Sequence, residues 1–547
     1  MKIGIDLDNT IISYDDAFLN VAKRRDLIDH DFQGSKSEVK QEIKQQKDGE
    51  KIWQKLQGQV YGKYIDQANI FPGFKRFHWR CSNQQIPVTI ISHKTEYGHY
   101  DEEKISLRMS ALSFLEQEGI VNKDKNIFIQ NLFFTTTREE KIKTIRHNNF
   151  DWFIDDLQEV IFDENLRDLP NKILFSKKTM EQRVDVKFCS SWSEIEHEIF
   201  GPISEKEIET IAAKIFNQQV LSTHTVGGRG NSGVYKITLH DNSKAALKIY
   251  SDNEGHNRLY SEYNGSALLV EKGIHQIPKP LTCNHDLNCA AYEWIEGKLV
   301  EYPTEENLNQ SFMLLNQLHN LRNLTAFSSF PRASAACFSG FDIELQLKQR
   351  FKKLHEQGEM EEGIKSYIYN ELEPFIEKMI VWSKERWSEF DDFERVLTQE
   401  DLTLSPSDFG FHNALKKDSG EIIFHDFEYF GWDDPVKLII DFSLHPGMNL
   451  DEKLLRKWFQ GTFKIYGKKL LPKLLAAWPL YALCWVLIYL NEFLPDVWRR
   501  RILADPSKLN EKELILEKQL SASRRLLNVI KNNYERNSII GASEIYV

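Results

Sequence analysis

Short apolar runs recur through the first 200 residues and are separated by polar segments with helical spacing. The runs are Ile3–Leu7, Val88–Ile91, Ile127–Ile129, Trp152–Ile154 and Ile173–Phe175. Strands that alternate with helices in this way favour a parallel, doubly wound sheet, because each crossover helix then covers one face of the sheet. We therefore expect residues 1–200 to form one α/β domain.

The first two apolar runs are separated by residues 14–86, which are rich in Lys, Gln and Asp at helical spacing. Such a segment is too long for a plain crossover loop. We expect it to form a helical insertion that covers the functional site as a cap.

Polar side chains follow three of the predicted strands at the point where each strand ends. Asp6 and Asp8 close the first strand, Ser92 closes the second, and Asp155 and Asp156 follow the run FDWFI. Ligands of parallel sheets bind at the carboxyl ends of the strands. Carboxylate oxygens suit Mg²⁺. A carboxylate that attacks phosphorus forms an aspartyl-phosphate, and a second carboxylate can act first as general acid and then as general base.

These residues resemble those of the haloacid dehalogenase-like phosphatases. Asp6, Asp8 and Thr10 match the D-x-D-x-T motif of that family, Ser92 matches its small hydroxyl residue, and Asp155-Asp156 matches its acidic pair. The resemblance implies a Rossmann-like parallel sheet with a helical cap at about 14–86. The presence of Asp8 favours a phosphatase over a dehalogenase-type or inactive relative.

The same resemblance implies individual roles. Asp6 would be the nucleophile and Asp8 the acid/base. Mg²⁺ would be held by Asp6, by the backbone carbonyl of Asp8 and by Asp155, with Asp156 supporting the site. The family also needs a lysine before the acidic pair to neutralise the phosphate. Lys141 in REEKIKTI is our choice and Lys143 is the alternative.

The sequence pattern changes near residue 200. Gly201-Pro202 is followed by Ser204 and Glu207, the spacing of a helix capping box. From Thr223 to Tyr250 the sequence predicts β-hairpins with a turn at Asp241-Asn242, and helical patterns dominate from about Thr304 onward. We expect a second domain over 201–547, with a strand-rich lobe at about 205–297 and a helical lobe at about 298–547.

A glycine-rich segment and a lysine in the strand-rich lobe indicate a nucleotide site. Gly228, Gly230 and Gly233 form a G-x-G-x-x-G motif, and a strand-like run rather than a helix follows it. This order favours a β-turn over nucleotide phosphates rather than a dinucleotide fold. Lys248 lies where a phosphate-binding cation is needed. Glu262 is the candidate that pairs with it, and Glu271 is the lesser one.

The helical lobe contains the strongest signal of the second domain. Asp408 and Asn413 are separated as in a kinase catalytic loop, and Asp426 follows the apolar run IIF and begins an Asp-Phe-Glu triplet. Phosphoryl transfer needs a positioning carboxylate, metal ligands and phosphate cations more than covalent help. These residues, together with Lys248, are of the types that fill those roles.

The second set of residues resembles the aminoglycoside phosphotransferase and choline kinase-like family. The signs are Asp-Phe-Glu in place of Asp-Phe-Gly, the absence of an Ala-Pro-Glu segment, the later Asp441, and Gln317-Leu-His319. The resemblance implies a protein-kinase-like α+β bilobal domain that binds ATP between its lobes, with a hinge at Glu293–Gly297. It implies that Asp408 is the catalytic base, that Asn413 and Asp426 are Mg²⁺ ligands, and that Asp441 braces the catalytic loop.

One residue departs from the pattern of this second family, which usually has His two positions before the catalytic Asp. Here that position is Pro406. That His mostly supports loop geometry, so the departure questions the activity of the kinase without removing it. His412 and His425 lie nearby, and a packing or hydrogen-bonding role is favoured for each.

Composition limits the classes of binding partner and the cellular compartment that we expect. The net charge of −11 argues against nucleic acid as a partner. The six cysteines form no C-x-x-C pair and suit a reducing cytosol. The apolar stretch Leu474–Leu490 contains Pro479 and is short for a membrane span, so we expect a buried helix pair there. These features favour a cytoplasmic enzyme that acts on small molecules and has no membrane span.

Together the two halves predict a bifunctional enzyme, a Mg²⁺-dependent phosphatase joined to an ATP-dependent kinase of a small hydroxylated metabolite such as a sugar or alditol. The two activities could act in sequence on one metabolite, which we favour, or oppose each other as a control pair. In one alternative hypothesis, one module is a silent nucleotide-binding or regulatory domain. In another, the pair processes nucleic-acid ends.

Overall fold

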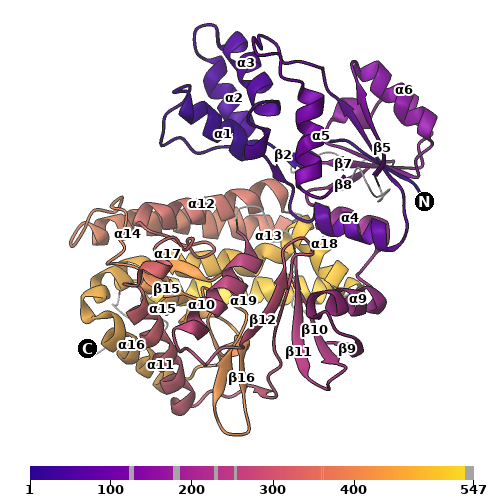
Figure 1. Ribbon diagram of the computed structural model, residues 1–547. Coiled ribbons are helices and arrows are strands. Elements are labelled where there is room, and N and C mark those ends of the chain that lie inside the picture. Colours follow the sequence, from indigo (N-terminus) through magenta and orange to yellow (C-terminus); the bar gives the residue numbers. More distant parts are fainter. Residues whose placement is uncertain are drawn as a thin grey trace. The chain divides into compact units, whose positions relative to one another are not determined.

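The computed structural model describes residues 1–121, 129–176, 185–226, 232–251, 256–358, 360, 362–504 and 506–535. The chain divides into two compact units. The first comprises Met1–Ile203 with a few short pieces from later in the chain, and the second comprises most of the remainder. Figure 1 labels the elements of both units along the chain.

The first unit contains a six-stranded sheet in the order β5-β4-β1-β6-β7-β8, and all neighbouring strands in it are parallel. The strands are β1 (Ile3–Ile5), β4 (Val88–His93), β5 (Ile129–Thr135), β6 (Trp152–Asp155), β7 (Asn171–Phe175) and β8 (Lys187–Cys189). All five predicted runs contribute to strands, although residues 127 and 128 of the third run lie outside the described residues. The edge strand β8 has only one buried residue in three, so its sequence lacks a strong apolar run.

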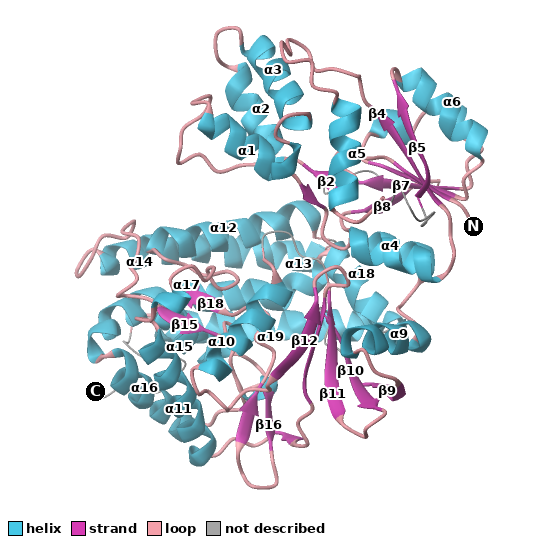
Figure 2. Cartoon of the chain, viewed as in Figure 1, coloured by secondary structure: helices cyan, strands magenta, loops and turns pink. Residues whose placement is uncertain are grey.

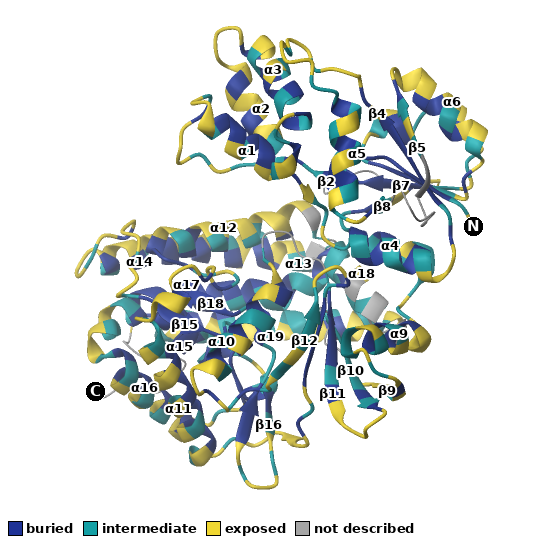
Figure 3. Cartoon of the chain, viewed as in Figure 1, coloured by how far each residue is buried: buried dark blue, intermediate teal, exposed yellow. Residues whose placement is uncertain are grey.

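The central position of β1 determines where the polar strand ends meet. Ile5 pairs with Ile90 of β4 on one side and with Ile154 of β6 on the other. The sheet interior is largely buried, as the dark blue strands of Figure 3 show. The residues that follow β1, β4 and β6 therefore lie next to one another at one edge of the sheet.

Seven helices of the first unit are α1 (Asp15–Arg24), α2 (Lys36–Lys44), α3 (Gly49–Tyr61), α4 (Phe74–Asn83), α5 (Leu107–Gln117), α6 (Arg138–Asn148) and α8 (Trp192–Phe200). The first three lie side by side in Figure 1 and contact one another. Helix α2 begins at a capping box between Ser35 and Glu38, and it buries Val39 and Ile43 one turn apart.

The helical insertion is shorter than the predicted range 14–86. A two-stranded antiparallel ribbon, β2 (Ile12–Ser13) with β3 (Asn69–Ile70), joins its two ends. Helix α4 lies outside this ribbon and packs against α8, with the ring centroids of Phe74 and Trp192 4.8 Å apart. The apolar face of α4 thus belongs to the sheet's own helical cover rather than to the insertion.

The second unit begins with α9 (Glu205–Phe216), which starts at the predicted capping box of Ser204 and Glu207. An antiparallel sheet follows in the order β12-β13-β11-β10-β9. Its strands are β9 (Val220–Thr225), β10 (Ser232–Leu239), β11 (Lys244–Tyr250), β12 (Pro280–Asn284) and β13 (Cys289–Glu293). The β10–β11 turn contains Asn242 at φ 64°, a conformation that Asn tolerates.

The rest of the second unit is mainly helical, and Figure 2 shows short strands among the helices. The longer helices are α11 (Glu305–Leu321), α12 (Gly340–Gln357), α14 (Glu373–Trp387), α15 (Pro435–Leu444), α16 (Glu452–Tyr466), α17 (Leu471–Tyr489), α18 (Pro495–Ala504) and α19 (Lys512–Asn533). The strands are β14 (Lys298–Leu299), β15 (Thr403–Ser405), β16 (Ala414–Lys416), β17 (Ile422–Phe424) and β18 (Gly431–Asp433).

The apolar stretch Leu474–Leu490 was expected to form a buried helix pair, but α17 is one helix that continues through Pro479. Helices α12, α14, α15 and α19 pack against it, so tertiary packing outweighs the local cost of the proline. Lys468–Phe493 is long and apolar enough to cross a bilayer by length and composition alone. Of its most apolar window, 72% is buried in the structure, as in the core helix of a globular unit.

Candidate functional sites

Three carboxylates meet at the carboxyl edge of the parallel sheet. The backbone N–H of Asp6 donates to the carbonyl oxygen of Ile154 over 2.9 Å, which extends the pairing of β1 with β6 to the site. One carboxylate oxygen each of Asp6, Asp155 and Asp156 lies within 4.8 Å of the other two. Asp6 and Asp155 are buried. The sheet register thus brings together three of the predicted residues.

Lys141 on α6 lies between two of these carboxylates. Its Nζ is 2.6 Å from Asp6 Oδ1 and 2.6 Å from Asp155 Oδ2, and its side chain is buried. The other oxygen of Asp6 accepts a hydrogen bond from Thr10 Oγ1 over 3.2 Å. Lys143, two residues further along α6, is exposed. The helix therefore directs Lys141 rather than Lys143 to the carboxylates.

One lysine does not balance the three carboxylates of this cluster. Burial, with the neighbouring Asp155 and Asp8, raises the pKa of Asp6 to about 7 against the opposing effect of Lys141. Burial, with Asp6 and Asp155, raises the pKa of Asp156 to about 8. Burial is the main cause of both shifts, and the neighbouring carboxylates add to it, since three carboxylates outnumber the one ammonium group among them. An all-oxygen donor set with excess negative charge fits a hard divalent cation such as Mg²⁺.

Asp8 lies beside this cluster with partners of its own. Its Oδ1 accepts from Tyr14 OH over 2.7 Å and from Lys94 Nζ over 2.9 Å, and its Oδ2 lies 3.4 Å from Ser92 Oγ. Burial acts to raise the pKa of Asp8, but Lys94 and Tyr14 outweigh it and hold that pKa below its usual value. Sequence reasoning missed Lys94 and Tyr14. Their positions, two residues after Ser92 and at the start of the insertion, were the only signals.

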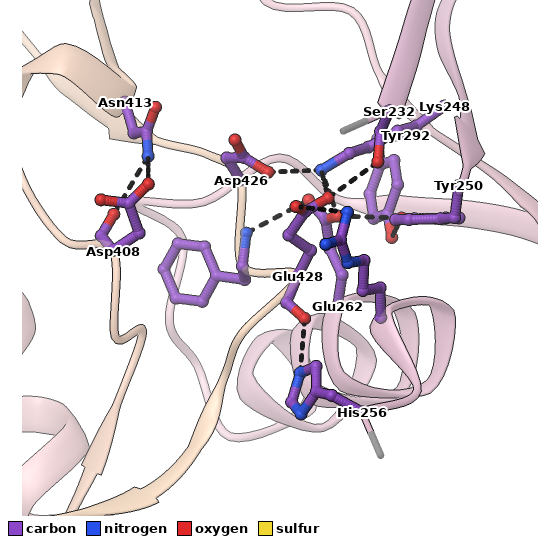
Figure 4. A network of polar contacts seen from close by, with 12 residues as sticks. Ser232, Lys248, Tyr250, His256, Glu262, Tyr292, Asp408, Asn413, Asp426 and Glu428 are labelled. Carbon is purple, nitrogen blue, oxygen red and sulfur yellow. Dashed lines mark hydrogen bonds and ion pairs between the residues drawn. The ribbon is translucent and has the colours of Figure 1, made fainter. Parts of the chain in front are cut away.

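The second cluster lies in a cleft of about 510 Å³ in the second unit. Lys248 on β11 is its centre, and Figure 4 shows carboxylates from two other segments directed toward its ammonium. Lys248 Nζ is 2.7 Å from Glu262 Oε2 and 3.1 Å from Glu428 Oε2, and it also pairs with Asp426. Burial opposes the charge on Lys248, but these three carboxylates raise its pKa well above the usual value.

Glu262 links the strands to the segment that contains Asp426. It lies in the helical turn Tyr260–Asn264, where its Oε2 also accepts from Tyr250 OH over 2.9 Å. Its Oε1 accepts from the backbone N–H of Phe427 over 3.2 Å. Burial, with the carboxylates of Asp426 and Glu428, raises the pKa of Glu262 to about 7 despite Lys248. Glu271 is exposed and pairs with Lys272, so Glu262 is the partner of Lys248.

The Asp-Phe-Glu triplet contributes two carboxylates to the cleft. Asp426 has φ 69°, a conformation that non-glycine residues rarely adopt and that occurs at functional sites. Glu428 accepts from Ser232 Oγ over 2.9 Å and pairs with Arg258 Nη1 at 3.3 Å. Glu428 is buried, and sequence analysis gave it no role. Its place in the triplet was the available signal.

Asp408 and Asn413 lie on the loop between β15 and β16. Asn413 Nδ2 donates to the backbone oxygen of Asp408 over 3.0 Å and to its Oδ2 over 3.3 Å. His412 Nε2 lies 3.0 Å from Asp408 Oδ1, and its ring stacks on that of His445 at 3.7 Å. Figure 4 shows Asp426 between Lys248 and the pair Asp408–Asn413. A histidine four residues after Asp408 thus supports its carboxylate, where the related motif has a histidine two residues before it.

A chain of contacts connects Asp441 to this loop. Its Oδ1 accepts from Trp485 Nε1 over 2.8 Å, and its Oδ2 is 3.0 Å from Lys437 Nζ. Trp485 packs edge-to-face on His445 at 5.3 Å. The predicted bracing residue therefore reaches the loop through side-chain packing.

The structure describes only some of the remaining residues that were predicted for the cleft. Gly228 and Gly230 lie outside the described residues. Gly233 lies in β10, paired with Ile249. Glu293 ends β13 and lines the cleft. Apolar side chains also line it, including Val234, Ala246 and Leu415, so the cleft has room and surface for a flat base beside a cation for phosphate.

No protein family model matches the chain, and no curated protein sequence matches it. Solved structures match about 59% of it. They include spectinomycin phosphotransferase in complex with ADP and spectinomycin, with 12% identity over 59% of this chain and 99% of that one and a TM-score of 0.43. A gentamicin complex of the aminoglycoside phosphotransferase APH(2")-IIa has 15% identity over 59% and 96%, with a TM-score of 0.41. Choline kinase from Cryptosporidium parvum Iowa II has 13% identity over 59% and 100%, with a TM-score of 0.38.

Proposed function

We propose that the chain is a bifunctional phosphoryl-transfer enzyme. The first unit would be a Mg²⁺-dependent phosphomonoester hydrolase of the haloacid dehalogenase-like type. The second would be an ATP-dependent kinase of a small hydroxylated metabolite, of the sugar or alditol type. The observation that carries the proposal is that a buried lysine is held among carboxylates in each unit: Lys141 between Asp6 and Asp155, and Lys248 among Glu262, Asp426 and Glu428.

In the hydrolase, Asp6 attacks the phosphorus of a phosphomonoester, and the bond from phosphorus to the leaving oxygen breaks. Asp8 in its protonated form donates a proton to that oxygen, although Lys94 and Tyr14 hold its pKa low in the free site. It then takes a proton from the water that cleaves the aspartyl-phosphate, which releases inorganic phosphate and restores Asp6. Lys141 would neutralise charge on the phosphoryl oxygens, since its ammonium group contacts Asp6. Bound Mg²⁺ would be held by Asp6, Asp155 and Asp156 and would lower the repulsion between carboxylate and phosphate.

In the kinase, Asp408 accepts the proton of the substrate hydroxyl as the hydroxyl oxygen attacks the terminal phosphorus of ATP. The bond from that phosphorus to the oxygen that bridges it to the β-phosphate breaks, and ADP leaves with this oxygen. Asn413 and His412 hold the Asp408 carboxylate in place through hydrogen bonds. Lys248 provides the cation for the nucleotide phosphates, and Glu262 fixes its position. Bound Mg²⁺ would be held by Asn413 and Asp426 and would neutralise phosphate charge.

A metabolite screen tests both halves of the proposal. Sugars, alditols and their phosphates are incubated with the full chain, Mg²⁺ and ATP, and inorganic phosphate and ADP are measured separately, with EDTA as the control. We expect Mg²⁺-dependent phosphate release from at least one phosphomonoester and substrate-dependent ADP formation with at least one alcohol. Absence of both activities, even with a simple aryl phosphate, would refute the proposal.

Pro406 supports one alternative, a second unit that binds nucleotide without turnover. The hydrogen bond from His412 to Asp408 favours activity instead, because it restores support to the carboxylate. ATP binding without ADP formation across the whole screen would favour the silent unit.

A further inference from the structure

Four side chains that the proposed hydrolase reaction does not use surround Asp8. Lys36 comes from α2 and Tyr61 from the end of α3, both in the helical insertion, whereas Tyr14 precedes α1 and Lys94 follows β4. The ring centroids of Tyr14 and Tyr61 are 4.6 Å apart, edge to face. The two lysines thus share one aromatic wall next to Asp8.

Both ammonium groups contact that wall. Lys36 Nζ lies 5.3 Å from the ring centroid of Tyr61, and Lys94 Nζ lies 4.6 Å from the same centroid. Lys36 Nζ also lies 5.2 Å from the ring centroid of Phe18. An ammonium group packed against aromatic rings has lost part of its hydration, which is costly unless a counter-charge or good hydrogen bonds replace it.

The partners of Lys36 are neutral. Its Nζ donates to Asn9 Oδ1 over 3.0 Å and to Tyr61 OH over 2.8 Å. Within the part of the chain that the structure describes, it forms no ion pair with a carboxylate. Lys94, by contrast, pairs with Asp8 at 2.9 Å, and its side chain is 3% exposed. An ammonium group has three donors, so both lysines have donors left for a ligand.

The position of these groups indicates which part of a substrate they would contact. In the proposed reaction, the transferred phosphoryl group contacts Asp6 and Lys141. A general acid must reach the leaving oxygen, so the side of Asp8 that faces the insertion is the leaving-group side. Lys36, Lys94 and the two tyrosines therefore lie on the side of Asp8 where the leaving group would be.

We propose that the leaving group of the hydrolase substrate contains a second anionic group, a carboxylate or a second phosphate, which Lys36 and Lys94 bind against the ring of Tyr61. This inference rests on the proposed hydrolase function and names its substrate class. Among the residues that the structure describes, Lys36 supplies a positive charge that forms no ion pair with a carboxylate, although Asp8 and Asp156 act on it through space. Lys94 is shared between Asp8 and the ligand.

Matched substrates test this inference on the full chain with Mg²⁺. Phosphoglycolate is compared with ethyl phosphate, which lacks the carboxylate, and propane-1,3-diol bisphosphate is compared with propyl phosphate, which lacks the second phosphate. We expect kcat/KM to be at least about tenfold higher for one doubly anionic compound than for its partner, because a charge-assisted contact with a desolvated ammonium is lost otherwise. The pair that shows the preference identifies the anion.

Substitutions then assign the preference to Lys36. We expect Lys36→Met to reduce that ratio about tenfold or more and Lys36→Arg to retain most of it. Lys40→Met is the matched control, because Lys40 is exposed on the same helix and should leave the ratio as in the unsubstituted chain. An equal kcat/KM within each substrate pair, or a preference that survives Lys36→Met, would overturn the inference while the hydrolase function stands. Absence of hydrolysis of every compound, including an aryl phosphate, would instead refute the hydrolase function.

Discussion

Lys248 Nζ and Glu262 Oε2 form an ion pair at 2.7 Å between strand β11 of the five-stranded sheet and the helical turn Tyr260–Asn264. Both side chains are buried. Because Glu262 also accepts from the backbone N–H of Phe427, one carboxylate positions both the lysine and the segment that contains Asp426. This pair therefore determines how the cation and the metal ligand of the proposed kinase lie relative to each other.

Substitution of Glu262 should weaken the kinase without affecting the hydrolase. Glu262→Gln keeps the shape but removes the charge that holds Lys248, and we expect a fall in kcat/KM for ATP of about 10- to 100-fold, or roughly 1.4–2.7 kcal/mol. ADP formation measures the effect. Glu271→Gln, an exposed change nine residues later, should alter nothing. Equal rates for the two variants would disprove the role of Glu262.

His412 should act as a positioning residue for Asp408. His412→Ala removes the hydrogen bond at 3.0 Å and the stacking partner of His445. We expect kcat of the kinase to fall about tenfold while KM for ATP changes little, because the defect lies at the substrate hydroxyl and not at the nucleotide. Steady-state kinetics at varied ATP separates the two parameters. A rise in KM for ATP with unchanged kcat would contradict this role, and recovery of kcat in His412→Asn would support it.

Lys141 and Lys143 provide a matched pair on α6. Lys141→Met should abolish phosphate release, since it removes the positive charge shared by Asp6 and Asp155. Breaking such a buried pair also costs about 3–5 kcal/mol of stability, so the thermal midpoint is measured alongside activity and again with added Mg²⁺. Lys143→Met should retain both activity and stability. If Lys143→Met were the inactive variant, the assignment of the phosphate lysine would be wrong.

The stability of the first unit should fall between pH 6.5 and pH 4 in part because of His78 on α4. Burial lowers the pKa of His78 to about 4, against about 6.5 in an unfolded chain. The neutral imidazole is thus favoured in the folded state. As the pH falls from 6.5 to 4, the unfolded chain gains a proton at this position that the folded chain does not, which lowers the free energy of unfolding by up to about 3 kcal/mol. His78→Phe should flatten the fall of the urea midpoint over this range, and an unchanged pH dependence would contradict the assignment.

Residues that end strands were predictable, because a parallel sheet brings the carboxyl ends of its strands together. Asp6 and Asp155 follow from this rule, whereas Asp408 and Asn413 were predicted from their spacing, which is that of a kinase catalytic loop. Lys141 was our choice and Lys143 the alternative, and α6 gives the physical reason for the choice, because it directs Lys141 to the carboxylates and leaves Lys143 exposed.

Some partners from distant segments could not be predicted. Lys36 reaches the surroundings of Asp8 from the insertion, and Arg258 pairs with Glu428 from a distant part of the sequence. Such pairs depend on how surface helices dock, and no local pattern records that. The prediction of a helix pair at Pro479 was wrong for a related reason. Packing around α17 keeps the helix continuous where the local rule for proline predicts a break.

The central claim is that each unit has its own phosphoryl-transfer site, and paired substitutions in the full chain test it most directly. Phosphate release and ADP formation are measured for Asp6→Asn and Asp408→Asn with the same Mg²⁺ and substrates. We expect Asp6→Asn to abolish phosphate release while ADP formation continues, and Asp408→Asn to do the reverse. Loss of both activities in either variant, or loss of neither in both, would contradict the claim.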